Sequence, residues 1–228
     1  KFYQIQVTEK QISEIKVTIT GPDGYSAIFP PKGSANASLG NLLVKLDKQL
    51  LPVHITPVAR KMIEMWSSAL PFPSNMIFRL LLKPSLTNFV LKLLGEKGKI
   101  LHTLVHNNAN VIKIEGGQTD TLQIPNKIEV HLKPIILPGY GLEDIIAELK
   151  RHIPSAADFE VLRFDSVPEV PDMALYDMLA QILKEEDPAG IPMPMILPTS
   201  TDGKNFCRLG IQTYGFLPMP LPAGFDFS

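Results

Sequence analysis

The spacing of apolar residues changes several times along the chain and constrains the fold more than any single motif. Residues 3–20 alternate apolar and polar side chains, as half-buried strands do. A turn at 21–24 follows. Residues 39–50 then carry leucines at the spacing of one helix face. The alternating positions are Ile5 and Val7, then Ile15, Val17 and Ile19, and the helical positions are Leu39, Leu42, Leu43, Leu46 and Leu50.

The same succession recurs further along the chain. Alternating stretches at 110–115 and 128–137 predict two strands, residues 142–149 predict a helix with one apolar face, and 159–164 predict a last strand. The order is therefore strand, strand, helix, strand, strand, helix, strand. It favours an α+β fold of ferredoxin-like topology, in which two helices pack on one face of an antiparallel sheet.

Residues 52–105 interrupt this pattern and are predicted to form a helical insertion. The segment is apolar and contains five prolines, and its stretch 76–94 mixes Leu, Ile and Phe with Arg79, Lys83 and Lys92. Two interpretations are open. The favoured one is packing against the parent sheet or a subunit partner, and the other is an amphipathic surface that touches a membrane or a lipid-like substrate.

A proline-containing joint at 168–171 separates residues 1–166 from a segment of different character, 167–228. This segment predicts a helix from Asp172, an extended run at 191–197, a polar turn, a short helix over 201–209 and a strand around Tyr214. Strand–helix–strand succession is typical of α/β sheets.

Composition excludes several classes of protein. The net charge is −1, so a nucleic-acid partner is not expected. A single cysteine, Cys207, permits no internal disulfide and no Cys metal cluster, and we expect a cytoplasmic location. No apolar run is long enough to span a membrane, and a membrane partner is not expected. Because the chain starts within a strand-like stretch and not with Met, we expect a fragment of a longer protein.

Four motifs occur in an order that points to one family. They are Val7-Thr8-Glu9-Lys10 before an alternating strand, Ile124-Pro125, Leu137-Pro138-Gly139 before an acidic helix, and Thr201-Asp202-Gly203 before a short helix. The chain thereby resembles the M20 family of zinc peptidases and deacylases. The resemblance implies a lid, or dimerisation, domain at 1–166 and the last part of the catalytic domain at 167–228.

The resemblance also implies an activity and partners. These are hydrolysis of an amide next to a free carboxylate in a small peptide or N-acyl amino acid, two zinc ions in the full-length enzyme, and a homodimer formed through the lid. The family's His-x-Asp ligand segment is absent, since none of the five histidines lies in such a motif. We therefore expect no zinc site in this chain alone.

Three lid positions depart from the family pattern. Tyr25 stands where the family has a His that reaches the scissile carbonyl, Leu122 where it has an Asn, and Ile135 where it has an Arg. A tyrosine hydroxyl can donate to an oxyanion, but Leu and Ile bind no carboxylate. The departures leave open a divergent substrate, a pseudoenzyme or a non-catalytic dimerisation module. A small-molecule regulatory domain is a third option that leaves Thr201-Asp202-Gly203 unexplained.

The polar turn near the C-terminal end supplies the candidate substrate-binding residues. Ser200, Thr201 and Asp202 begin a helix, where hydroxyls and free N–H groups bind an anion or merely cap the helix. Arg208, on that helix, is either a carboxylate clamp or a surface residue. His102 and His106 are four residues apart, but no third metal ligand is evident.

A first prediction concerns metal content. Because the sequence lacks a converging set of zinc ligands, the purified chain should carry less than about one equivalent of zinc and show no amidase activity. Elemental analysis measures this directly, and stoichiometric zinc would contradict the interpretation.

Overall fold

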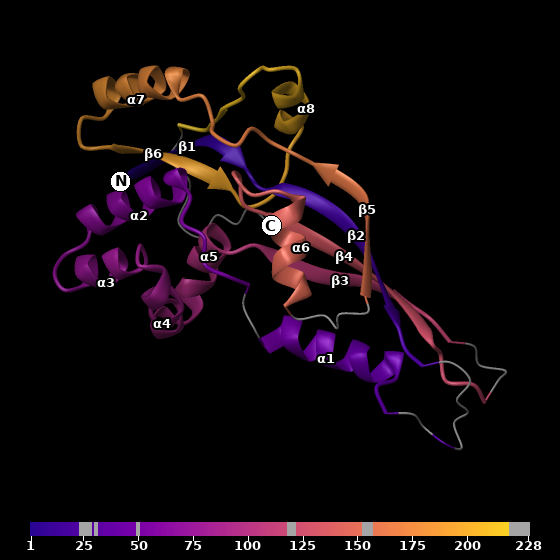
Figure 1. Ribbon diagram of the computed structural model, residues 1–228. Coiled ribbons are helices and arrows are strands. Elements are labelled where there is room, and N and C mark those ends of the chain that lie inside the picture. The colour runs from indigo at the N-terminus through magenta and orange to yellow at the C-terminus, as the bar shows by residue number, and fades with distance from the viewer. Residues whose placement is uncertain (23–28, 30–31, 49–50, 118–121, 152–156, 219–228) are drawn as a thin grey trace.

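The computed structural model describes residues 1–22, 29, 32–48, 51–117, 122–151 and 157–218, which form two sheets and their covering helices (Figure 1). The larger sheet, the lid sheet, has the order β3-β4-β2-β5 with antiparallel neighbours throughout. Its strands are β2 (Gln11–Thr20), β3 (Asn108–Glu115), β4 (Lys127–Ile136) and β5 (Ala157–Asp165).

Two helices, α1 (Ala35–Lys48) and α6 (Leu142–Lys150), cover one face of the lid sheet, which confirms the predicted ferredoxin-like α+β layer. The alternation seen in the sequence explains this arrangement, because every second residue of β2 and β4 is buried against the helices. The core between them consists of Ile15, Val17, Ile19, Ala35, Leu42, Leu51, Ile128, Val130, Leu132, Ile136, Ile145 and Leu149.

The second sheet has three strands in the order β6-β1-β7, and its bounds are β1 (Phe2–Glu9), β6 (Ile191–Leu197) and β7 (Gly215–Phe216). Strand β1 runs parallel to β6 and antiparallel to β7. The C-terminal segment adds α7 (Ala174–Glu186) and α8 (Gly203–Arg208). The predicted strand–helix–strand succession is thus present, and the extended run at 191–197 forms β6, an edge strand of this sheet.

The structure corrects one expectation, that both strands of residues 3–20 belong to the same antiparallel sheet. They lie in different sheets, and only Lys10 stands between the end of β1 and the start of β2. Alternation predicts a half-buried strand but not its neighbours, and β1 finds its partners in strands almost 200 residues away.

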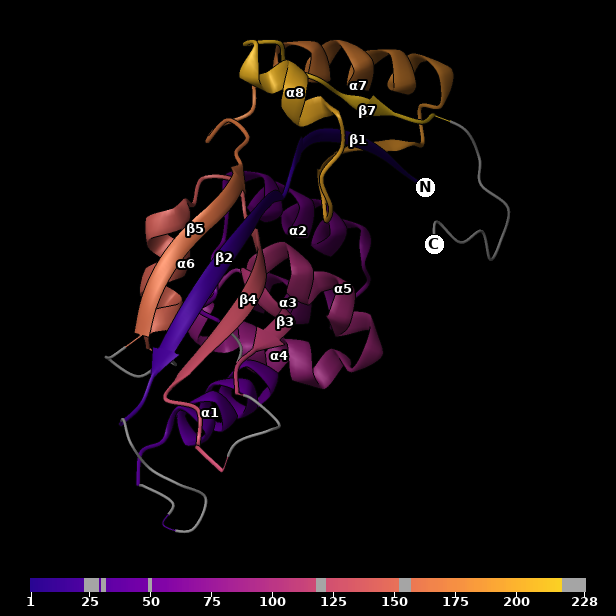
Figure 2. The ribbon, with the colours of Figure 1, turned by 90° about the vertical axis from the view of Figure 1, so that its right-hand side faces the viewer.

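The insertion consists of the helices α2 (Pro57–Ala69), α3 (Ser74–Leu80), α4 (Pro84–Leu94) and α5 (Glu96–Val105). Prolines open α2 and α4, where a missing N–H has no cost. Helix α2 packs against the β6-β1-β7 sheet on the side opposite α7, and α3, α4 and α5 follow it further from the sheet, as Figures 1 and 2 show.

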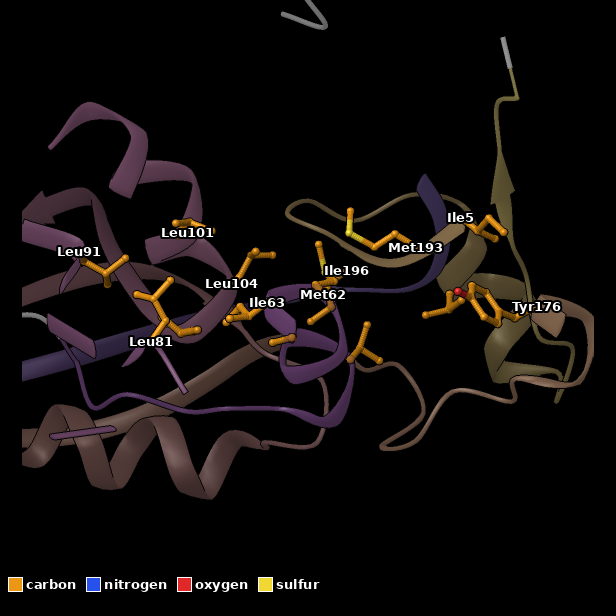
Figure 3. Packing of buried hydrophobic residues seen from close by; sticks show 14 of the residues in the cluster. Ile5, Met62, Ile63, Leu81, Leu91, Leu101, Leu104, Tyr176, Met193 and Ile196 are labelled. Atoms are coloured by element: carbon orange, nitrogen blue, oxygen red, sulfur yellow. The ribbon is translucent and has the colours of Figure 1, made fainter. Parts of the chain in front are cut away.

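Figure 3 shows the apolar contacts of this packing, in which Met62 of α2 lies near Ile196 of β6 and Ile63 of α2 lies near Leu104 of α5. Packing of the insertion against a sheet was the favoured interpretation, but the sheet is β6-β1-β7 and not the lid sheet. None of the described helices is long and apolar enough to cross a membrane.

Lys10, between the two sheets, is almost completely buried, with 1% of its surface exposed. Its ammonium donates one hydrogen bond, at 3.2 Å, to the His106 carbonyl oxygen. Burial lowers the pKa of Lys10 from 10.5 to about 8. Between pH 8 and pH 10.5 the Lys10 side chain is protonated in the unfolded chain and neutral in the folded chain, so the free energy of unfolding rises with pH. Below pH 8 the folded chain carries the buried charge, which destabilises the fold.

We therefore predict that Lys10→Met stabilises the protein at pH 7. Removing the buried charge recovers about 3 kcal/mol, and the lost hydrogen bond subtracts about 1 kcal/mol. Urea unfolding should show a free energy of unfolding raised by about 2 kcal/mol and a flatter pH dependence between pH 8 and 10.5.

Lys184→Met, which removes an exposed lysine of α7, is the control and should change little. The assignment of a buried, destabilising charge would be contradicted if Lys10→Met lowered the free energy of unfolding and left its pH dependence unchanged.

Candidate functional site

The chain passes from one sheet to the other through three consecutive buried polar residues, which we call the crossover: Glu9, Lys10 and Gln11. Their exposed fractions are 4%, 1% and 3%. Polar side chains are buried this completely only when they are hydrogen-bonded. Each of the three bonds to a different part of the chain, so the crossover positions the elements around it.

Glu9 holds the polar turn before α8. Its carboxylate accepts the Thr201 backbone N–H at 2.8 Å, the Thr201 hydroxyl at 2.5 Å and the Ser200 hydroxyl at 3.4 Å. Asp202 is the N-cap of α8 but makes no capping hydrogen bond with its side chain. The predicted donors of Ser200 and Thr201 thus bind a carboxylate that belongs to the chain itself. A substrate role for Ser200, Thr201 and Asp202 stays a prediction.

Gln11 joins the lid to the joint that leads out of it. Its amide N–H groups donate to the carbonyl oxygens of Leu137 at 3.1 Å and Tyr140 at 2.7 Å, and its amide oxygen accepts the Val167 N–H at 3.2 Å. The Leu137-Pro138-Gly139 motif therefore forms a loop that the crossover holds from one side.

Asn107 holds the same loop from the other side. Its amide oxygen accepts the Leu137 N–H at 2.8 Å, and its amide nitrogen donates to the carboxylate of Glu148, a buried residue of α6. His54 Nε2 lies 2.6 Å from the same carboxylate. Asn107 thereby fixes both the loop and α6 to the start of β3. The sequence analysis did not predict this role for Asn107.

His102 lies in α5 and His106 follows the last helical residue in an extended conformation, and their rings are stacked at a centroid distance of 4.1 Å. Burial lowers the pKa of His106 to about 4, and its Nε2 lies 2.9 Å from the Asn88 side-chain oxygen. In the part of the chain that the structure describes, no Asp, Glu, Cys or third His joins them in a ligand cluster. The pair is a buried stack and lacks the ligands of a metal site.

Asp165, at the end of β5, gathers three cations. Its carboxylate accepts hydrogen bonds from Lys204 at 3.0 Å and Arg208 at 2.8 Å, both in α8, and Arg163 lies 2.8 Å away. Burial alone raises the pKa of Asp165, but the hydrogen bonds from the three cations hold it far below its ordinary value. Arg208 therefore pairs with a carboxylate of the chain itself, and a substrate role for Arg208 stays a prediction.

A cleft of about 180 Å³ lies beside this ion cluster, on the face of the lid sheet that α1 and α6 leave open. Figure 2 looks onto this face, with α8 above it. Strands β2, β4 and β5 and helix α8 supply its lining, which consists of Ile12, Ser13, Glu14, Lys133, Arg163, Asp165 and Lys204.

The cleft lining carries three cations, Lys133, Arg163 and Lys204, against two carboxylates, Glu14 and Asp165, and an apolar patch lies beside it. Asp165 is shared by Arg163, Lys204 and Arg208, and Lys133 forms no ion pair with any described residue. Ile135, on the same side of β4 as Lys133, stands directly opposite Ile12. Such a site suits a small anion that carries an apolar group.

The lid positions that depart from the family pattern have separate locations. Tyr25 lies outside the described residues. Leu122 is 69% exposed and lies before the start of β4. Ile135 belongs to β4 beside the cleft, two residues after Lys133. Strand alternation alone could have found Lys133 as a cation on the face of Ile135, because side chains two residues apart share one face.

The described residues do not fit a two-zinc site. Only one group of three ligating side chains converges among them, Glu115, Glu129 and His131, whose ligand atoms lie within 4.8 Å of one another. Lys113 and Lys127 pair with the two carboxylates at 2.8 and 2.7 Å. Three side chains cannot coordinate two zinc ions, which take about four ligands each.

Comparison with known proteins places this architecture. The family model of the peptidase dimerisation domain, M20_dimer, matches residues 7–160. The chain therefore belongs to the M20 peptidase dimerisation family, and the predicted resemblance is confirmed. No curated protein matches the chain.

Two solved structures share the fold at low sequence identity. The aminopeptidase PepT of Bacillus cereus is 15% identical with a TM-score of 0.52, and the match covers 94% of this chain and 45% of PepT. The dipeptidase Dug1p of Saccharomyces cerevisiae is 14% identical with a TM-score of 0.51, covering 95% of this chain and 49% of Dug1p. The chain thus spans about half the length of these relatives.

The contacts of Glu9 generate a prediction for Thr201. Thr201→Ala removes a hydroxyl donor from a buried carboxylate, so the free energy of unfolding should fall by about 1–3 kcal/mol. Thr199→Ala, two residues earlier and exposed, is the matched control and should have no effect. Denaturant unfolding of both variants tests this, and equal stability of the two would show that the bond to Glu9 contributes nothing.

Proposed function

We propose that the protein is part of a zinc-dependent M20-type peptidase or N-acyl-amino-acid amidohydrolase, and that the cleft beside α8 takes the substrate carboxylate. Family membership supports the reaction class. The observation that carries the assignment of the cleft is Lys133, a cation that forms no ion pair with the described residues and lies on the same strand face as Ile135, where the family has its arginine. Division into a lid at 1–166 and a catalytic segment at 167–228, and a cytoplasmic location, are parts of the same proposal.

The residues of the cleft bind and orient the substrate in this proposal. Lys133 pairs with the carboxylate of the substrate. Lys204 and Arg208 keep their hydrogen bonds to Asp165 and contribute only positive electrostatic potential. Ile12 and Ile135 contact the apolar part next to the carboxylate. A small peptide or an N-acyl amino acid offers both groups. Because the described residues do not fit a zinc pair, we assign them no step at the metal.

A second candidate is a non-catalytic dimerisation or binding module, or a pseudoenzyme, of the same fold. The apolar residues Leu122 and Ile135 at two lid positions favour it, since neither can bind a carboxylate. The two candidates differ in what Lys133 does, because only the enzyme needs a carboxylate contact that affects turnover.

The test compares a substrate with and without its carboxylate. In the complete enzyme, Lys133→Met should raise KM for an N-acetyl amino acid about tenfold, because a charge-assisted hydrogen bond contributes about 1.5–3 kcal/mol. The methyl ester of the same substrate lacks the charge and should be unaffected.

Lys113→Met, on the neighbouring strand β3, is the control. Equal losses on acid and ester would overturn the assignment of Lys133, and absence of hydrolysis by the unaltered enzyme would favour the non-catalytic module.

We further propose that two copies pair through the lid. Strand β3 is an edge of the lid sheet and exposes Ile112 and Ile114, at 53% and 45%, and α1 exposes Val44 at 51%. An edge with exposed apolar side chains is a template for pairing with another strand. A two-fold dimer in which α1 lies near the axis covers these residues.

Charge on this edge should prevent pairing. Ile112→Lys combined with Ile114→Lys is expected to convert the dimer to a monomer, because it places like charges opposite each other across the two-fold axis. Val161→Lys, on the opposite edge strand β5, is the matched control and should remain dimeric. Light scattering at high concentration measures the mass, and a monomeric unaltered protein would count against the proposal.

A further inference from the structure

Helix α4 presents an apolar stripe to solvent. Leu86, Phe89 and Leu93 are spaced at i, i+3 and i+7, so they share one helix face, and their side chains are 36%, 68% and 63% exposed. A soluble helix normally turns such a stripe into the core. No described part of the chain covers this one.

The opposite face of α4 is already packed, which fixes the direction of the stripe. Thr87, Val90 and Leu91 are buried, and the Thr87 hydroxyl donates to the carbonyl oxygens of Leu81 and Lys83 at 2.9 Å. Val90 and Leu91 belong to the core shared with α2, α5 and β6. Rotation that would bury Phe89 and Leu93 would expose this core, so the outward stripe is a stable feature of the fold.

The adjoining segment also exposes apolar side chains. Phe72, just before α3, is 75% exposed, and Met76 of α3 is 58% exposed. Helices α3 and α4 are in contact, and Figures 1 and 2 show them together in the insertion. We call the side chains of Phe72, Met76, Leu86, Phe89 and Leu93 the α3–α4 surface.

Charge within the segment that carries the α3–α4 surface is of one sign. Arg79, Lys83 and Lys92 are the charged residues between positions 65 and 95, and this stretch contains no Asp or Glu. All three are exposed in the structure. Basic side chains beside exposed aromatic and aliphatic ones are the composition of helices that lie at a lipid surface.

Helix α7 provides an internal comparison. Leu175, Met178 and Ile182 repeat the same spacing and are 42%, 59% and 46% exposed. That helix carries Asp177, Glu185 and Glu186 against Lys184, so its surroundings are acidic. Both α4 and α7 therefore expose an apolar stripe. They differ in charge, because the segment around α4 is basic and α7 is acidic.

We propose that the α3–α4 surface docks on an anionic lipid membrane, with α3 and α4 lying in the plane of the interface. The apolar side chains enter the headgroup region and the three cations bind lipid phosphates and carboxylates. Helix α4, of 11 residues, is too short to span the bilayer. This proposal departs from the expectation of no membrane partner and adopts the second interpretation of the insertion for its outer face.

Vesicle flotation tests the proposal with the full chain. The protein should float with vesicles of phosphatidylcholine and phosphatidylserine, float about tenfold less with phosphatidylcholine alone, and lose binding as salt is raised. Phe89→Ser combined with Leu93→Ser should lower partitioning at least about tenfold, since two large apolar side chains no longer insert.

Met178→Ser combined with Ile182→Ser on α7 is the matched control and should leave partitioning unchanged. Circular dichroism confirms that both proteins are folded. Absence of flotation, or equal loss in both double variants, overturns the proposal. A third outcome also overturns it: light scattering shows that only the Phe89→Ser/Leu93→Ser variant dissociates from an oligomer to a monomer, while its lipid binding is unchanged. The α3–α4 surface then contacts a second copy of the chain.

Discussion

The arrangement of the molecule depends on the crossover, where one chain segment changes sheets without a loop. Glu9, Lys10 and Gln11 are all buried, and each bonds to a segment distant in sequence. Glu9 bonds to the turn before α8, Lys10 to the residue after α5, and Gln11 to the loop between β4 and α6 and to Val167. Buried polar groups must be paired, so these three residues permit few alternative arrangements of the two sheets. The position of α8 over the open face of the lid sheet follows from them.

The cleft is a consequence of that arrangement. Asp165 ends β5 on the lid, and Lys204 and Arg208 come from α8, so the ion cluster forms only when the crossover has set both elements in place. Helix α8 has six residues and makes few apolar contacts of its own; Glu9 and Asp165 hold it from two sides. The shape of the cleft beside Lys133 therefore depends on contacts made outside its lining, at Glu9 and Thr201.

The sequence predicted local structure well because the relevant forces are local. Alternation located β2, β4 and β5, leucine spacing located α1, and the turn before α8 was recognised from its polar residues. What the sequence did not show depended on distant partners. Strand β1 pairs with β6 and not with β2, since alternation does not specify the neighbouring strand. The contacts of Ser200 and Thr201 with Glu9 were not predicted, because no local pattern shows which carboxylate reaches a free N–H. Asn107 and Asp165 acquire their roles only from residues that the fold brings to them.

Native-state hydrogen exchange tests most directly whether the crossover couples the two sheets. If it does, the slowest amides of β2 and β4 and those of β1 and β6 should open with the same free energy, that of global unfolding, and Gln11→Ala should lower both together. Slow amides of the β6-β1-β7 sheet that open at a lower free energy of their own, unaffected by Gln11→Ala, would contradict the account.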